Sequence, residues 1–129
     1  MTAIPPHNLD TERAALGCVL IDPRAVFSLL GAVREEHFYS PAHQVIFRAI
    51  ERMHKRGEPI DLTLLAEHLQ SHANLEEIGG PAYLAGLEAY VFTTENLPAY
   101  CAAIKSLWRM RRGIEAAREM AADWQSEES

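Results

Sequence analysis

Apolar residues recur along the chain at the three- and four-residue spacing of an amphipathic helix. The clearest set stands at positions i, i+3, i+4 and i+7 and consists of Val26, Leu29, Leu30 and Val33. A second apolar face of the same kind consists of Val45, Ile46, Ala49, Ile50 and Met53. No segment carries a convincing strand pattern. The spacing therefore predicts an all-α protein.

Capping residues, prolines and glycines divide this pattern into separate helices. Side chains that can cap a helix N-terminus stand at Asn8, Asp22, Ser40, Asp61 and Asn96. Gly57 and the segment Gly79-Gly80-Pro81 are typical of helix ends and turns. The connections are short, which favours compact stacking, and Gly17 indicates close packing of the first helix. We expect helices that begin at Leu9, Asp22-Pro23, Pro41, Leu62, Ala82 and Leu97.

The last helix is predicted to be much longer than the others. Its apolar positions run from Leu97 to Trp124, which corresponds to roughly 40 Å at 1.5 Å per residue. A helix of that length cannot lie wholly on a head built from helices half as long, so part of it should project. Projection leaves Ile114 and Trp124 without an intramolecular cover, and exposed apolar surface of this kind marks an interface.

Composition excludes several classes of protein. The 129 residues have a formal charge of −6, which argues against a chain that binds nucleic acid over its whole surface. Any DNA contact should be local and weak. No window approaches ~18 consecutive apolar residues and the start lacks signal-peptide character, so we expect no membrane span and a cytoplasmic location. Cys18 and Cys101 do not form a disulfide or zinc pattern and are interpreted as buried hydrophobes.

Two clusters of titratable residues are candidates for chemistry. Glu67, His68 and His72 place two imidazoles at i, i+4, a spacing that can hold zinc, but the H-E-x-x-H pattern is incomplete. The segment from Ser71 to Asn74 is expected past the helix end, so solvated surface histidines are the favoured interpretation. The second cluster could serve acid and base roles but is also typical of a connector before a helix; it consists of Glu35, Glu36, His37 and His43.

The sequence has no Gly-Lys pair and hence no phosphate loop, so we expect no ATP hydrolysis by this chain. Basic residues are concentrated on the long helix, at Lys105, Arg109, Arg111, Arg112 and Arg118. They span several faces, and Glu115 and Glu119 lie at pairing distance along the helix. A solvated helix face is therefore favoured over a stripe that contacts phosphates.

Taken in order, several segments resemble the amino-terminal domain of bacterial replicative helicases of the DnaB type. The opening Ile4-Pro-Pro-His-Asn-Leu9 with Ala15-Leu-Gly17 and Leu20-Ile-Asp22 resembles the family's proline arm and first helix. The resemblance continues through Phe38-Tyr39 with His43 and Ile46-Phe47, Pro59-Ile-Asp-Leu62 with Leu65-Ala-Glu67, Leu75 to Gly80, Ala82-Tyr83-Leu84, Asn96 with Tyr100, Ile104-Lys105, and Arg111 to Ile114. It departs at Cys18 and Ser106, and the family's second hairpin helix, linker and motor domain are absent.

The resemblance implies a compact orthogonal helical head, residues 1–92, and the first helix of a hairpin, residues 96–129. It implies a non-catalytic domain that supports assembly of a hexameric collar and docks primase, with a helicase loader and its own motor domain as further partners. ATP and magnesium would be bound only by that motor. Since the covering hairpin helix is missing, weak self-association or partner binding is expected at Leu107, Trp108, Met110, Arg111 and Ile114.

Two other functions remain open at this stage. A stand-alone helical adaptor or regulator sharing the fold would be excluded by a coding sequence that continues into a second helix and a G-x-x-x-x-G-K-[ST] segment. A small metal-dependent enzyme is the more distant alternative, and purified protein without stoichiometric zinc or iron would exclude it.

Overall fold

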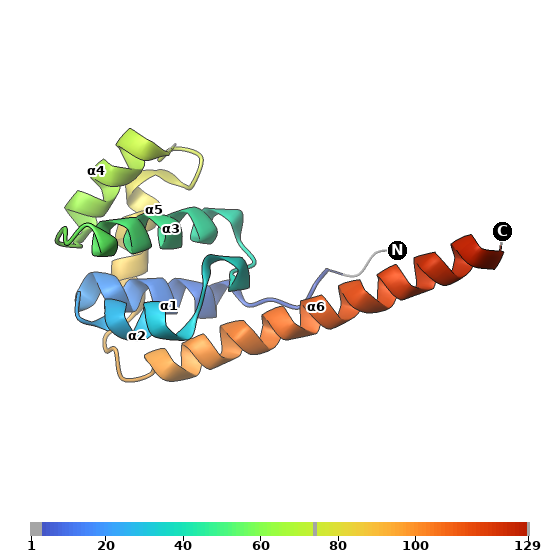
Figure 1. Cartoon of the computed structure of the whole chain (residues 1–129). Coiled ribbons are helices and arrows are strands. Elements are labelled where there is room, and N and C mark those ends of the chain that lie inside the picture. The colour runs from blue at the N-terminus through green and yellow to red at the C-terminus, as the bar shows by residue number, and fades with distance from the viewer. Residues whose placement is uncertain (1–3, 74, 129) are drawn as a thin grey trace.

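A computed structural model describes residues 4–73 and 75–128 of the chain. The described residues form six α-helices and one short 3₁₀ helix, with no strand among them. The elements are α1 (Leu9–Ile21), α2 (Ala25–Ala32), η1 (Glu35–His37), α3 (Pro41–Lys55), α4 (Leu62–His72), α5 (Gly80–Tyr90) and α6 (Leu97–Glu128). The prediction of an all-α protein is confirmed. As Figure 1 shows, the first five helices gather into a head and α6 extends away from it.

Helix α1 lies at the centre of the head and contacts α2, α3, α5 and α6. Apart from Glu12, its buried residues form an unbroken run from Ala14 to Leu20, because neighbouring helices cover it on several sides. Gly17 is the point of closest approach to α5. A Cβ atom there would lie 2.3 Å from the carbonyl oxygen of Leu87, so only glycine fits without a backbone shift. The close packing expected at Gly17 is confirmed.

Three of the predicted caps are formed as expected. Oδ1 of Asn8 accepts from the backbone N–H of Thr11 at 3.1 Å. The side chain of Ser40 caps α3 through the N–H of His43, and that of Asp61 caps α4. These bonds satisfy backbone donors that a helix N-terminus leaves without a partner.

Two predicted helix starts were wrong by two residues or more. The Asp22 side chain accepts from the N–H of Arg24, but α2 begins only at Ala25. The reason is a tight turn in which the N–H of Ala25 bonds to the carbonyl of Asp22. Helix α5 begins at Gly80 rather than Ala82, since Pro81 fits the first helical turn and Gly79 and Gly80 take positive φ.

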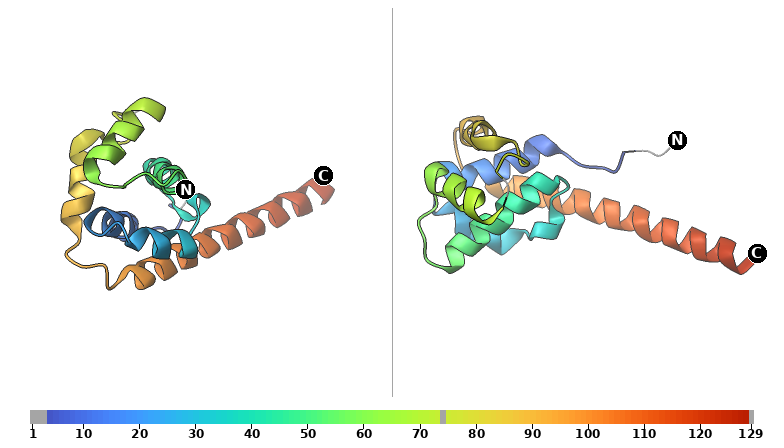
Figure 2. Two further views of the ribbon diagram at one scale, coloured as in Figure 1. Left: turned by 60° about the vertical axis from the view of Figure 1, so that its left-hand side comes forward. Right: turned by 90° about the horizontal axis from the view of Figure 1, so that it is seen from above.

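Helix α6 changes from a packed to a solvent-exposed helix along its length. Leu97, Cys101 and Ile104 are buried against the head, whereas every side chain from Arg112 to Glu127 is exposed. The two further views in Figure 2 show this distal part standing clear of the head. The expectation that the long helix projects is confirmed.

The division into a head at residues 1–92 and a hairpin helix at 96–129 stays a prediction. Its outer limits, residues 1–3 and Ser129, lie outside the described residues, as does Asn74. Within the described residues, no helix is long and apolar enough to cross a membrane.

Candidate functional site

The root of α6 is fastened to the head and to the amino-terminal arm by Arg111. One terminal nitrogen of its guanidinium donates to the carbonyl of Pro6 and the other to the carbonyl of His37, both at 2.9 Å. The guanidinium carbon also lies 5.4 Å from the centre of the Tyr39 ring, a cation–π distance. A planar guanidinium can serve two carbonyls at once, so Arg111 joins three segments distant in sequence.

The arm itself packs on the connector that leads into α3. The His7 ring stacks on the Tyr39 ring with 4.0 Å between centroids and 13° between planes. Nδ1 of His7 lies 2.7 Å from the carbonyl oxygen of Pro5, which fixes the local turn of the arm. Tyr39 is therefore held between His7 on the arm and Arg111 on α6.

Trp108 packs against the head, next to Arg111. Its ring meets the His37 ring edge-on at 4.7 Å and 65°. Nδ1 of His37 accepts from the backbone N–H of Arg34 at 2.9 Å, so this nitrogen is unprotonated in the folded state. Burial lowers the pKa of His37, and the nearby cations Lys105, Arg34 and Arg109 lower it further against the opposing effect of Glu36.

A groove of about 300 Å³ opens between these parts. The arm contributes Ile4 to its lining, the connector before α3 contributes Phe38, and α6 contributes Trp108 and Ile114. Three arginines and Glu115 of α6, together with Glu36 of η1, also line the groove around these apolar side chains. The groove is therefore an apolar recess with a charged rim at the point where α6 leaves the head.

From the head outward, α6 carries an apolar seam, which we define as Leu107, Met110, Ile114, Ala117, Ala121 and Trp124. These positions alternate by three and four residues, the heptad spacing of helices that pair side by side. Met110 is 54% exposed, Ile114 40% and Trp124 64%, so three large apolar side chains of the seam face solvent. Among the described residues the distal seam has no covering element.

The five predicted interface residues thus fall into two groups. Leu107, Trp108 and Arg111 are partly buried at the head, while Met110 and Ile114 are exposed on the seam. A role for any of them in self-association or partner binding stays a prediction. The basic residues of α6 also fall into two groups. Arg112 pairs with Glu115 at 2.8 Å, as expected for a solvated helix, whereas the Arg111 guanidinium bonds to the carbonyl of Pro6.

A buried polar network that the sequence pattern did not predict lies directly behind the connector that carries Tyr39. The Glu12 residue is buried, and its carboxylate accepts from the backbone N–H groups of Tyr39 and Ser40 at 2.8 and 3.2 Å. Nδ1 of His43 lies 2.7 Å from the same carboxylate, and Nε2 lies 2.5 Å from the Tyr83 hydroxyl. The network joins α1, α3 and α5, and we call it the Glu12 network.

The predicted acid–base cluster does not exist as one site. Only His43 belongs to the Glu12 network, since His37 faces Trp108 and Glu35 forms an ion pair with Arg48. No group of these four residues faces a common cavity. The structure gives the cluster a role in holding connectors and helices together.

The interpretation of His68 as a solvated histidine was wrong. His68 is 8% exposed and its ring stacks on that of His72 at 4.3 Å, with α4 continuing through Ser71 and His72. Burial lowers the pKa of His68, with His72 as a further cause. Among the described residues, no group of three or more histidines, cysteines and acids could hold a metal ion.

Both cysteines are buried and free, as predicted. Burial raises the pKa of the Cys101 thiol to about 11, and the nearby Cys18 adds to the shift. A thiol that stays protonated in this way is a poor nucleophile. The cysteines therefore act as small apolar side chains of the core.

Comparison with known proteins gives consistent results. The family model described as the DnaB-like helicase N terminal domain matches residues 4–106. The replicative DNA helicase DnaB of Geobacillus stearothermophilus is 39% identical over 120 residues, which cover 93% of this chain and 26% of that protein. DnaB of Treponema pallidum is 38% identical over 93% of this chain and 27% of its own length. This chain therefore spans about a quarter of the length of each of these two relatives.

Solved structures of similar fold point the same way. The crystal structure of the N-terminal domain of DnaB helicase from Mycobacterium tuberculosis has a TM-score of 0.88 at 34% identity, covering 92% of this chain and 83% of that one. The N-terminal domain of DnaB helicase from Helicobacter pylori, described with its interactions with primase, has a TM-score of 0.77 at 18% identity, covering 90% of each chain. At that identity the likeness shows the fold alone.

Proposed function

This chain belongs to the family of DnaB-like helicase N-terminal domains, and from that premise we propose that it is the non-catalytic assembly and docking domain of a replicative DNA helicase. In this proposal it supports the hexameric collar of the helicase and receives primase, and it works in the cytoplasm. ATP and magnesium would be bound by a separate motor domain. A helicase loader is a further proposed partner, and direct DNA binding by this domain would be weak.

The observation that carries the proposal is the exposed seam of α6. Met110, Ile114 and Trp124 lie on one face with heptad spacing, and a helix that leaves such a face open in water gains free energy when another helix covers it. The covering helix can be a following hairpin helix of a longer chain or the seam of a second copy. In either case the surface is suited to assembly and carries no catalytic group.

Primase docking is supported by the descriptions of two proteins with this fold. A DnaB-like replicative helicase whose structure is described with its interactions with primase has a TM-score of 0.79 at 24% identity. The Helicobacter pylori domain is described with primase as well. Their descriptions make primase the first partner to test for this chain, because a shared fold presents similarly arranged surfaces.

The assembly proposal is tested by placing a charge in the seam. In Ile114→Glu the carboxylate would have to be desolvated when the seam is covered, so self-association measured by sedimentation should weaken at least tenfold with helix content unchanged. The matched control is Ala122→Glu, which adds the same charge at an exposed residue of α6 outside the seam. If Ile114→Glu and the wild-type chain associate equally, the seam does not mediate self-association.

Trp108 provides a contrast within the same helix. Because the Trp108 ring packs on the His37 ring, Trp108→Glu should lower the melting temperature of the chain as well as any self-association. Primase docking is tested separately, with immobilised bacterial primase as the probe and the isolated chain in solution. If a folded chain that still dimerises shows no saturable binding to primase, the docking proposal is contradicted. The assembly proposal is not affected by that result.

A further inference from the structure

The face of α6 opposite the seam carries a row of acids. Glu119, Asp123 and Glu127 are four residues apart and exposed, and none has a basic side chain within 4 Å among the described residues. At 1.5 Å per residue the carboxylates repeat about every 6 Å along the helix. We call these three residues the acidic ridge. Met120 stands beside it and is 72% exposed.

A groove of complementary charge lies on the head, between α3 and α4. Arg48 and Arg52 of α3 and Arg56 at its C-cap are also four residues apart, so these three positions follow one line along the helix. Two adjoining hollows lie beside this line, the larger with a volume of about 320 Å³. His68 and His72 of α4 line both hollows. We call this surface the basic groove.

Some of the positive charge in the basic groove is already compensated. Glu35 pairs with Arg48, and Glu58 lies 4.0 Å from Arg56. Arg52, at the centre of the line, has no carboxylate within 4 Å among the described residues. It therefore offers a guanidinium that can still gain a carboxylate partner. Glu67 also borders the larger hollow, and it limits how far acids can approach at that side.

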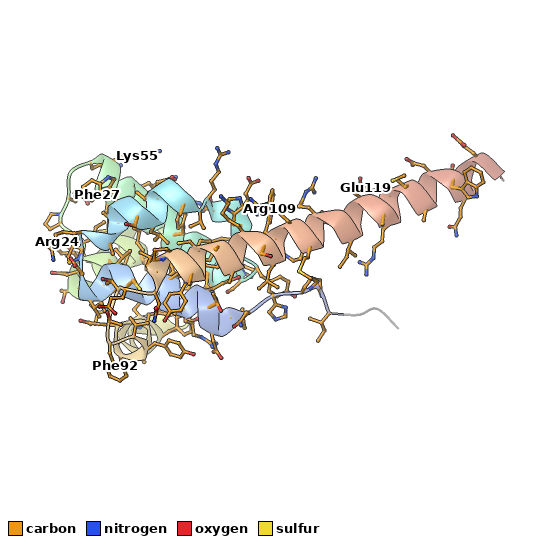
Figure 3. The ribbon with its side chains drawn as sticks, turned by 90° about the horizontal axis from the view of Figure 1, so that it is seen from below. Arg24, Phe27, Lys55, Phe92, Arg109 and Glu119 are labelled. Atoms are coloured by element: carbon orange, nitrogen blue, oxygen red, sulfur yellow. The ribbon has the colours of Figure 1, made fainter. Side chains whose placement is uncertain are left out.

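The acidic ridge and the basic groove cannot meet within one molecule. In Figure 3, Lys55 at the end of α3 lies at the far end of the head, while Glu119 stands on the projecting part of α6. The rigid, continuous helix keeps the ridge away from its own head. Any contact between the two surfaces must join different copies of the chain.

We propose that the acidic ridge of one copy docks in the basic groove of a second copy. The equal spacing of four residues lets carboxylates follow guanidiniums along the two helices, with Arg52 at the centre. The exposed Met120 side chain enters the larger hollow, where Met53 and Leu64 provide apolar contacts. Methionine suits this position because its flexible thioether adapts to irregular recesses.

This contact differs in symmetry from pairing through the seam. Seam pairing can be isologous, since the same surface is used on both copies, whereas ridge-to-groove docking uses two different surfaces and is heterologous. Heterologous contacts extend an assembly beyond two copies, into a closed ring or an open chain. Because the ridge and the seam lie on opposite faces of α6, both contacts can form on one helix, and neither requires the other.

Charge reversal tests the contact in an Ile114→Glu background, which blocks the seam. Residual association, measured by sedimentation velocity at low salt, should weaken at least tenfold in Arg52→Glu and in Asp123→Arg, because each variant brings like charges together. An equimolar mixture of the two should associate again. In that mixture, the unchanged acidic ridge of the Arg52→Glu variant meets the intact groove of the Asp123→Arg variant. The charge-reversed ridge of the Asp123→Arg variant can likewise meet the charge-reversed groove of its partner.

The matched control is Arg109→Glu, the same reversal at an exposed arginine on the proximal part of α6. It should keep the residual association, and thermal melts should show all variants folded. Three results would overturn the proposal: no residual association in the Ile114→Glu background, equal weakening by Arg109→Glu, or failure of the mixture to restore association. Since the seam is blocked throughout, these outcomes are independent of whether seam pairing itself is correct.

Discussion

Nδ1 of His43 lies 2.7 Å from Oε1 of Glu12, and the two side chains are 1% and 3% exposed. Since the carboxylate accepts, Nδ1 carries the hydrogen, and in the neutral ring Nε2 is left to accept from the Tyr83 hydroxyl. The Tyr83 oxygen in turn accepts from Nε of Arg13 at 3.4 Å. The Glu12 network is thereby satisfied from the core to the surface, which makes it a fixed junction between α1, α3 and α5.

Removing the Glu12 carboxylate should strongly destabilise the head. Glu12→Ala leaves the N–H groups of Tyr39 and Ser40 and Nδ1 of His43 without their acceptor, and each buried unsatisfied group costs about 1–3 kcal/mol. We expect the free energy of unfolding in urea to fall by about 3 kcal/mol or more. Asp10→Asn, at an exposed ion pair near the start of the same helix, should change it by about 0.5 kcal/mol at most. Similar losses in the two variants would contradict the assigned role of Glu12.

Two glycines in helices should respond to alanine with opposite sign. Gly17→Ala places a Cβ against the carbonyl of Leu87, so α1 and α5 must move apart at a cost of about 1–3 kcal/mol. Gly31 in α2 has no atom near its added Cβ, and Gly31→Ala should stabilise the protein by up to about 1 kcal/mol through higher helix propensity. Thermal melts of the two variants measure the difference. An unchanged melting temperature in Gly17→Ala would show that α1 and α5 are not in close contact at this point.

Helix caps and helix length could be predicted from the sequence because their causes are local. Asn8, Ser40 and Asp61 cap helices through bonds within three residues, so a local pattern was sufficient to place those helix starts. The projection of α6 followed from its length and from the size of the other helices. In each case the cause lies within one segment of the chain or in the lengths of the segments.

The Glu12 network could not be predicted in the same way, because the partners of Glu12 lie 27 to 31 residues further along the chain and Tyr83 lies 40 residues beyond His43. A signal was nevertheless present. Glu12 stands one turn before Leu16 on the buried face of α1, and His43 stands one turn before Phe47 on the buried face of α3. A polar residue in an apolar stripe indicates a buried group with a partner, but the identity of that partner requires the tertiary fold.

Arg111 was predicted as part of an interface, yet its guanidinium holds the arm. Arg111→Lys keeps the charge, but a single ammonium cannot reproduce the planar fork that serves the carbonyls of Pro6 and His37. The arm should detach, so nuclear Overhauser contacts between the His7 and Tyr39 rings should weaken or disappear. The control, Arg112→Lys, changes an exposed arginine that pairs with Glu115 and should preserve those contacts. Persistence of the ring contacts in Arg111→Lys would show that His7 stacking alone holds the arm.

His37 should make the stability of the head dependent on pH. Its folded-state pKa is lowered, first by burial and then by Lys105, Arg34 and Arg109, so the unfolded chain binds a proton more tightly than the folded one. Stability is therefore highest above the ordinary imidazole pKa of about 6.5 and falls as the pH decreases below it, by at most about 1.4 kcal/mol per pH unit for one group.

The hydrogen bond at Nδ1 acts in the same direction as burial, because a proton on Nδ1 of His37 would face the N–H of Arg34 that now donates to it. His68, whose pKa is also lowered by burial, adds a loss in the same direction. In His37→Asn, the side-chain oxygen can accept from Arg34 without titrating, so the decline in unfolding free energy between about pH 7.5 and 5.5 should become shallower. Urea unfolding at several pH values measures that slope, and NMR titration of the His37 ring provides the direct check. If the His37 imidazole titrates at or above the ordinary pKa of about 6.5, the contact with Arg34 does not oppose its protonation. The pH dependence of the unfolding free energy would then have to arise from His68 or from other groups.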